Sequence, residues 1–175
     1  ESSHIDKQLL LQAYHEYEAS LATQNAFDFD DLLEKVVRLF KESPEILEKY
    51  RRRFTHLMVD EYQDINNIQY ELIKLLAGES KNLSVVGDQN QTIYSFRGSN
   101  INIFLNFPKD WPDSLVIILE DNYRSSGNIL ESASRLITQN TIRLESASGS
   151  LRAVNDAGPL VQIYEATDEN DEAEW

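Results

Sequence analysis

Apolar residues in the first part of the chain recur with helical spacing. From Ile5 to Ala22 they are three or four positions apart, which places them on one face of a helix. After a polar turn, a second helix is predicted over residues 28–43, with acidic residues near its start. Ser43 and Pro44 form a good N-cap and first-turn pair, so a short third helix should begin there.

Four short apolar runs in the rest of the chain have the composition of β-strands. Loops or helical patterns separate them, and this alternation predicts an α/β fold with a mostly parallel sheet. The runs are residues 56–60, 83–88, 115–120 and 159–166. The stretch FPKDWPDSL at residues 107–115 carries two prolines and is the best candidate for a boundary between two lobes. Two evident strands per lobe are too few for an independent parallel sheet, so we expect a piece of a longer protein.

Polar stretches follow the first three of these runs. They read VDEYQD, VVGDQNQTIYSFRGS and EDNYRSS. In a parallel sheet the carboxyl ends of the strands meet at one edge, where phosphates and metals are usually bound. That edge would carry paired carboxylates, a glutamine, aromatic rings and guanidinium groups, which suit phosphoryl transfer with bases stacked nearby. The residues concerned are Asp60, Glu61, Gln91, Tyr94, Phe96, Arg97, Tyr123 and Arg124.

Each of these groups also has an ordinary structural explanation. An acid after a strand often only caps the next helix, and aromatic residues are more often buried in a core. A surface arginine usually does no more than pair with a carboxylate. The choice between the two explanations therefore depends on the motifs as a set.

Composition narrows the class of protein. The chain has 175 residues, of which 41% are hydrophobic, as expected of a folded, soluble protein. It contains no cysteine and three scattered histidines, which excludes disulfides and leaves no plausible zinc site. No run reaches the ~20 apolar residues of a bilayer span, and no basic signal peptide is evident. We therefore expect no membrane contact and a cytoplasmic location.

A net charge of −14 argues against coating nucleic acid through bulk electrostatics. It leaves room for a local groove, because charges separated by more than ~8 Å are largely screened at physiological salt.

Taken in order, the motifs closely resemble those of the UvrD, PcrA and Rep type of superfamily-1 DNA helicase. VDEYQD is similar to the family's Walker B motif, VVGDQNQTIYSFRGS to its third motif and LEDNYRSS to its fourth. FDFDDLL at residues 27–33 is similar to the acidic motif ahead of Walker B. The resemblance runs from Phe27 to Ser126, more than half of the chain, and the spacing of its GD, Q, IY and FRG elements is specific.

The resemblance implies roles at the matching positions in a nucleotide site. Asp60 would hold Mg²⁺, and Glu61 would orient and polarise the attacking water. Gln91 would sense the γ-phosphate of ATP. Tyr123 would stack on adenine, and Arg124 would reach the γ-phosphate from the second motor lobe as an arginine finger. ATP and Mg²⁺ are thus the implied cofactors.

The resemblance also implies a path for single-stranded DNA, lined by Tyr94, Phe96 and Arg97. Phe96 would stack on a base where many relatives carry tryptophan, which should matter little because any large aromatic face can stack, at ~1 to 3 kcal/mol per base. Single-stranded DNA and duplex junctions are the implied partners, and 3′ to 5′ polarity is taken wholly from the resemblance.

The implied architecture is a pair of partial, parallel-sheet RecA-like motor lobes with a helical segment at the N-terminus. Residues 1–24 would be the end of an inserted helical subdomain, 25–110 the second half of the first motor domain and 111–175 the start of the second. The phosphate-binding motif G-x-x-x-x-G-K-[ST] is absent from these residues, as are the family's later motifs. We therefore expect that the chain alone does not hydrolyse ATP.

The expected function is that of a fragment of an ATP-dependent 3′ to 5′ DNA helicase. Two alternatives stay open at this point. One is the motor subunit of a recombination helicase-nuclease, and the other is a non-catalytic binding module that retains helicase motifs.

Overall fold

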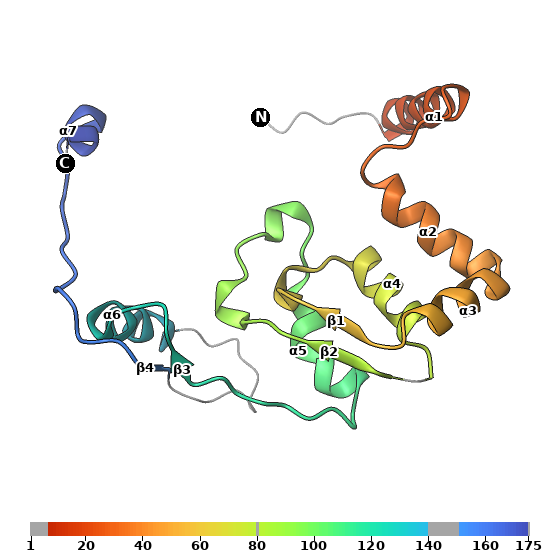
Figure 1. The fold of residues 1–175 in the computed structure, drawn as a ribbon. Coiled ribbons are helices and arrows are strands. Elements are labelled where there is room, and N and C mark those ends of the chain that lie inside the picture. Colours follow the sequence, from red (N-terminus) through yellow and green to blue (C-terminus); the bar gives the residue numbers. More distant parts are fainter. Residues whose placement is uncertain (1–6, 80, 140–150, 175) are drawn as a thin grey trace. The chain divides into compact units, whose positions relative to one another are not determined.

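The structure, a computed structural model, describes residues 7–79, 81–139 and 151–174. The chain separates into two compact units, Glu1–Phe104 and Leu105–Trp175. Each unit contains one pair of parallel strands among its described residues (Figure 1). The prediction of an α/β fold with parallel pairing is therefore confirmed at this level. None of the helices in the described ranges combines the length and hydropathy needed to span a bilayer.

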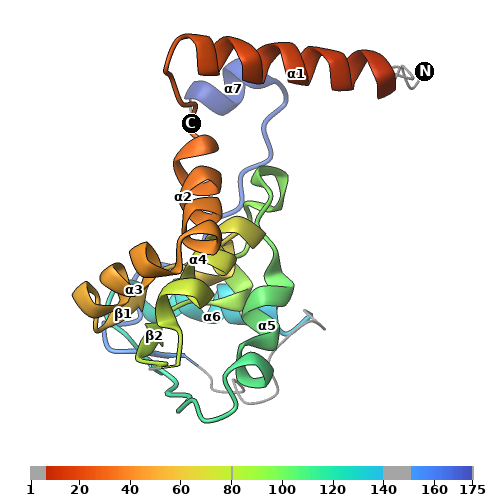
Figure 2. The ribbon, with the colours of Figure 1, turned by 90° about the vertical axis from the view of Figure 1, so that its right-hand side faces the viewer.

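The three helices predicted at the start of the chain are present. They are α1 (Lys7–Thr23), α2 (Asp31–Glu42) and α3 (Pro44–Arg53), and Pro44 opens α3 as expected. Ile5 lies outside the described residues. The helix α1 buries none of its side chains and crosses the start of α2 (Figure 2).

Polar contacts hold α1 to the start of α2. Lys35 of α2 pairs with Glu18 of α1 at 3.2 Å, and the Tyr17 hydroxyl donates to the Asp28 carboxylate at 2.7 Å. The same carboxylate accepts the backbone N–H of Asp31, the first residue of α2, at 2.8 Å. This backbone hydrogen bond, followed by the one from Tyr17, lowers the pKa of Asp28. Within the acidic FDFDDLL stretch, Asp28 thus stabilises the start of α2.

The core of the first unit surrounds the parallel pair of β1 (Leu57–Val59) and β2 (Leu83–Val85). The connecting helix α4 (Asn67–Ala77) packs on β1 and also contacts α2 and α3 (Figure 1). The helix α5 (Ile101–Asp110) begins in this unit. The buried apolar residues of the unit are Val37, Phe40, Leu47, Tyr62, Ile65, Ala77 and Ile103.

Local hydrogen bonds determine where α4 begins and ends. Asn66 and Gln69 form a reciprocal capping box at its start, with both bonds at 2.9 Å. At its end, the Arg51 guanidinium donates to the Leu75 carbonyl at 2.8 Å. Gly78 follows with a φ of +51°, and a Cβ there would lie 2.8 Å from Arg51 Nε. Arg51, in the basic stretch YRRRF at residues 50–54, therefore completes the C-terminal end of the helix α4.

The second unit contains the short strands β3 (Asp121–Asn122) and β4 (Arg152–Ala153), which pair in parallel. A salt bridge of 2.6 Å between Arg152 and Asp121 supports the pair. The described helices that lie wholly in this unit are α6 (Gly127–Ile137) and α7 (Glu169–Glu174).

Two of the four predicted strands are wrong. Residues 115–120 and 159–166 form no regular strand, although β3 begins directly after the first of these runs. Their side chains are largely exposed, with Ile117 at 72% and Ile163 at 96% of full exposure. An extended apolar segment becomes a strand only when a neighbour accepts and donates its backbone hydrogen bonds. Among the described residues, neither run pairs with a strand, although Glu120 at the end of the first run accepts the backbone N–H of Arg152 at 2.7 Å.

Candidate active site

The chain turns sharply at the predicted catalytic pair, directly after β1. Glu61 adopts a left-handed backbone conformation with a φ of +49°. Its N–H donates to Asp60 Oδ1, and its carbonyl accepts the N–H of Asp64, both at 2.9 Å. The next residue returns to the sheet, because Tyr62 N–H donates to the Val86 carbonyl at 2.9 Å. The turn leaves the side chains of Asp60 and Glu61 exposed at the carboxyl end of β1.

The side chain of Gln63 joins this turn to the loop after β2. Gln63 lies in the short 3₁₀ helix η1 (Tyr62–Asp64) and is only 1% exposed. Its Nε2 donates to Glu61 Oε2 at 2.8 Å, with a longer contact of 3.5 Å to Asp64 Oδ2. Its Oε1 accepts the backbone N–H of Asp88 at 3.0 Å. One buried amide therefore contacts both loops.

Gly87 makes this close approach of the loops possible. A Cβ at Gly87 would lie 2.6 Å from Gln63 Oε1 and 2.9 Å from the ring of Phe104. Both distances are shorter than any ordinary contact of a methyl group, so the site has no room for a larger residue.

The loop after β2 positions Gln91. Asp88 precedes the 3₁₀ helix η2 (Gln89–Gln91) and accepts the N–H of Asn90 at 2.9 Å. Its second carboxylate oxygen accepts Gln91 Nε2, also at 2.9 Å. The structure therefore links the two predicted catalytic groups of this unit, Glu61 and Gln91, by a continuous series of hydrogen bonds through Gln63 and Asp88.

The predicted DNA-contacting aromatic residues follow in the same loop. The rings of Tyr94 and Phe96 lie 5.9 Å apart, centroid to centroid, at an angle of 52°. Phe96, in η3 (Ser95–Arg97), is 76% exposed, so burial in a core does not explain it. The side chain of Arg97 lies outside the described part of the chain.

Tyr123 and Arg124 belong to the second unit, directly after β3. The Tyr123 side chain is 71% exposed, and its carbonyl accepts Asn155 Nδ2 at 2.9 Å. Arg124 donates its backbone N–H to Asn122 Oδ1 at 3.1 Å and has an exposed side chain. Their roles toward a shared ligand stay predictions, as do the roles of the residues in the first unit.

The donor set at Asp60 and Glu61 fits Mg²⁺ bound together with a nucleotide. In the described ranges, no three His, Asp or Glu side chains converge to hold a metal ion. A nucleotide-bound Mg²⁺ needs only one or two carboxylates, because phosphate oxygens and water supply its other ligands. Two adjacent, exposed carboxylates at the end of a strand meet that requirement.

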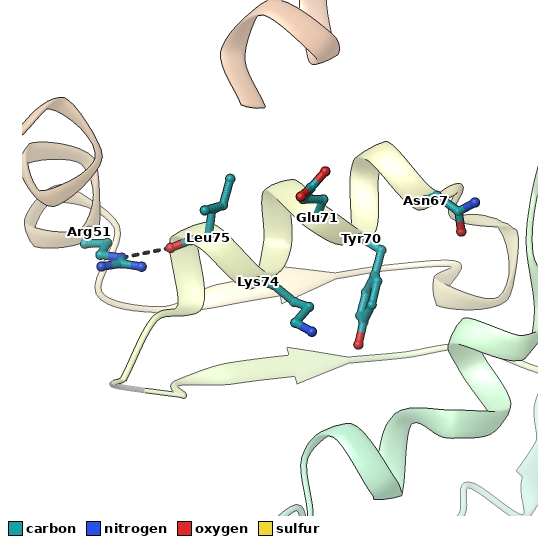
Figure 3. Close-up of a pocket in the computed structure, with 6 residues that line it drawn as sticks. All are labelled: Arg51, Asn67, Tyr70, Glu71, Lys74 and Leu75. Atoms are coloured by element: carbon teal, nitrogen blue, oxygen red, sulfur yellow. Dashed lines mark hydrogen bonds between the residues drawn. The ribbon is translucent and has the colours of Figure 1, made fainter. Parts of the chain in front are cut away.

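A pocket of about 430 Å³ lies elsewhere in the first unit, along α4 (Figure 3). It is lined by Arg51, Asn67, Tyr70, Glu71, Lys74 and Leu75, which include none of the predicted site residues. Its charged groups have partners within the protein. Arg51 binds the Leu75 carbonyl, Glu71 pairs with Lys41 at 2.6 Å, and Lys74 Nζ lies 5.2 Å from the centre of the Tyr70 ring. We therefore assign the pocket to helix packing.

Sequence reasoning missed three residues of the site, Gln63, Gly87 and Asp88. All three lie within the motifs VDEYQD and VVGDQ, but the contacts of Gln63 with Gly87 and Asp88 join positions 24 and 25 apart. A glycine next to an aspartate at a strand end was the one visible signal, because close backbone approach commonly requires glycine.

Comparisons with known proteins agree with the motifs. The family model of the UvrD/REP helicase N-terminal domain matches residues 1–112. The chain is 43% identical over all 175 residues to the ATP-dependent DNA helicase PcrA of Staphylococcus epidermidis (strain ATCC 35984). It is also 43% identical over its full length to PcrA of Staphylococcus aureus (strain Mu50). The chain spans 24% of the length of these curated relatives.

The backbone at Glu61 yields a stability prediction. At ordinary positions alanine is more stable than glycine by ~0.5 to 1 kcal/mol, but a left-handed conformation costs an L-residue ~1 to 2 kcal/mol. We therefore expect the free energy of unfolding of Glu61→Gly to be about 1 kcal/mol higher than that of Glu61→Ala. Urea denaturation of the two variants measures this difference. Both variants lose the bond to Gln63, so its loss cancels.

The same pair of substitutions at Asp60, whose φ is not positive, is the matched control. There glycine should be the less stable of the two. Equal stability of the two Glu61 variants would show that the turn does not require a left-handed residue.

Proposed function

The chain belongs to the UvrD/REP helicase family, and from this premise we propose that it forms part of the ATP-hydrolysing motor of a DNA helicase. The supporting observation is the hydrogen-bonded series from Glu61 through Gln63 and Asp88 to Gln91. It gives the carboxylate and the glutamine of a hydrolytic site a common support at one edge of a parallel strand pair. The relatives that match the whole chain are named ATP-dependent DNA helicases, which agrees with this chemistry.

In this proposal each residue of the first unit has one task during hydrolysis. Asp60 holds Mg²⁺, which supplies charge neutralisation on the phosphates when it is bound. The Glu61 carboxylate orients the attacking water and accepts its proton. The Gln91 amide contacts the γ-phosphate and so distinguishes ATP from ADP. Catalysis of this kind consists mainly of positioning, which a buried support such as Gln63 favours.

Residues of the second unit complete the site in the proposal. Tyr123 stacks on adenine through its exposed ring, and Arg124 contributes a positive charge at the γ-phosphate when the two motor lobes close. An arginine used in this way contributes ~10³ to 10⁵ to the rate of related enzymes. Substitution of Arg124 should therefore have little effect on DNA binding in the absence of nucleotide.

The proposed organisation is that of two partial RecA-like lobes. Residues 1–24 end an inserted helical subdomain, 25–110 belong to the first motor domain and 111–175 to the second. The phosphate-binding loop, absent from these residues, belongs to the longer protein that would contain this chain, hereafter the full-length protein. Translocation from 3′ to 5′ and action at duplex junctions are part of the proposal.

Tyr94 and Phe96 provide the proposed contact with single-stranded DNA. Two exposed rings that lie close together and tilted offer faces on which bases can stack. Arg97 follows them in sequence and would contact a phosphate. Stacking depends little on overall charge, so it can operate in a chain whose net charge is −14.

Substitutions of the two acids test the hydrolytic role. In the full-length protein, Glu61→Gln should retain ATP binding but lower turnover stimulated by oligothymidine by at least ~10² to 10⁴, the contribution of a general base. Asp60→Asn should in addition raise the Mg²⁺ concentration required for half-maximal turnover. Near-normal turnover of Glu61→Gln, or a magnesium titration of Asp60→Asn that overlays that of the unmodified protein, would remove the corresponding assignment. The 175-residue chain alone should show no hydrolysis.

Substitution of Phe96 tests the DNA contact. Phe96→Ala should weaken binding to oligothymidine by ~1 to 3 kcal/mol with an unchanged salt dependence, because stacking releases no counterions. Fluorescence anisotropy across a salt series measures both quantities. Phe54→Ala is a suitable control, because Phe54 is 44% exposed at the end of α3, where its ring stacks on Tyr50 and lies 5.7 Å from the Arg53 guanidinium. If both variants bind DNA equally well, the strand does not pass over Phe96.

A further inference from the structure

We propose that Gln63 is a positioning residue for hydrolysis, which holds the Glu61 carboxylate and the Asp88–Gln91 turn in a fixed relation through the two ends of one buried amide. This inference rests on the proposed function and deepens it, because it makes the support that Gln63 provides a requirement for the rate of hydrolysis. Gln63 is not expected to contact ATP or water itself.

The chemistry of the two partners determines the orientation of the amide. A backbone N–H can only donate, so the Gln63 atom that faces Asp88 at 3.0 Å must be the carbonyl oxygen. An ionised carboxylate can only accept, so the atom that faces Glu61 at 2.8 Å must be the NH₂ group. Both conditions are met by a single orientation. Burial of the side chain to 1% exposure removes competing water.

Glu61 needs such a support because little else among the described residues restrains its side chain. The residue is exposed and has a left-handed backbone, and Gln63 donates the side-chain hydrogen bond that its carboxylate receives in the structure. A hydrogen bond to a charged acceptor is stronger than one between neutral groups. The amide therefore restricts where the carboxylate can lie, and this decides how well it orients a water molecule.

The other end of the amide extends the support to Gln91. Asp88 donates its backbone N–H to Gln63 Oε1, and its carboxylate accepts a hydrogen bond from Gln91 Nε2 at 2.9 Å. Gly87 leaves the space that Gln63 Oε1 occupies, since a Cβ there would lie 2.6 Å from that oxygen. The loops are thus shaped around this amide. Asparagine, which is one methylene shorter, cannot keep both contacts at these distances.

The experiment uses the full-length protein and the variant Gln63→Met, which keeps the volume of the side chain and removes both hydrogen bonds. Gln69→Met is the matched control. Gln69 lies six residues away on α4 and also accepts a backbone N–H, that of Asn66, at 2.9 Å, but this bond belongs to the capping box of α4 and not to the series from Glu61 to Gln91. The measurements are kcat and KM for ATP with saturating oligothymidine, thermal unfolding, and hydrogen exchange at the Asp88 amide.

In Gln63→Met, kcat should fall by roughly 10- to 100-fold with little change in KM, as expected when a catalytic group is misplaced rather than removed. The Asp88 amide should exchange about three- to tenfold faster, the effect of losing one hydrogen bond. Gln69→Met should match the unmodified protein in kcat and in the exchange rate of the Asp88 amide. Its melting temperature should fall by an amount similar to that of Gln63→Met. A folded Gln63→Met with normal kcat would overturn the inference.

Gln63→Asn provides a second test in case methionine prevents folding, and it should also lower kcat without raising KM. Failure of both variants to fold would show that Gln63 serves the core alone, which also overturns the inference. DNA-stimulated hydrolysis by the unmodified protein distinguishes failure of this inference from failure of the proposed function. If it shows no DNA-stimulated hydrolysis, the proposed function fails and this inference with it. If it is active and the Gln63 variants match it, only this inference fails.

Discussion

The parallel pairing of β1 with β2 is the interaction on which the rest of the site depends. Its register sets Leu57 opposite Leu83 and Val59 opposite Val85, so the two strands end at the same level. The ladder continues past the strands, because Val86 N–H donates to the Val59 carbonyl and Tyr62 N–H to the Val86 carbonyl, both at 2.9 Å. A shift of one residue would reverse the faces of a strand and separate the two loops. Chain segments about 25 residues apart in sequence therefore meet at one edge.

This meeting leaves little space, and the sequence accommodates it in two ways. Gly87 has no side chain where one would collide with Gln63 and Phe104. Glu61, in contrast, keeps a side chain in a backbone conformation that favours glycine. Strain of this kind persists where the surrounding structure holds it, and it is common at functional sites. A residue chosen for stability alone would be glycine, so the glutamate supports a chemical role for this position.

The sequence predicted the elements whose signals are local. The helix α1 follows from apolar spacing, α2 from a helical stretch with acidic residues near its start, and α3 from Ser43 and Pro44. The strands β1 and β2 follow from short apolar runs that end in polar residues. The runs at 115–120 and 159–166 have the same local signal, yet they form no strand, because pairing depends on neighbours that a local pattern cannot reveal. The candidate site divides in the same way. Asp60, Glu61 and Gln91 stood out by residue type and motif, whereas the link through Gln63 depends on contacts across 25 residues.

The most direct measurement is ATP hydrolysis by a chimera in which this chain replaces the matching segment of PcrA from Staphylococcus epidermidis, to which it is 43% identical over its full length. The remainder of that protein would supply the parts of the motor that this chain lacks. If the chain carries the hydrolytic edge of a helicase motor, the folded chimera should hydrolyse ATP and be stimulated by single-stranded DNA. A folded chimera that binds nucleotide and DNA but shows no DNA-stimulated hydrolysis would contradict this assignment.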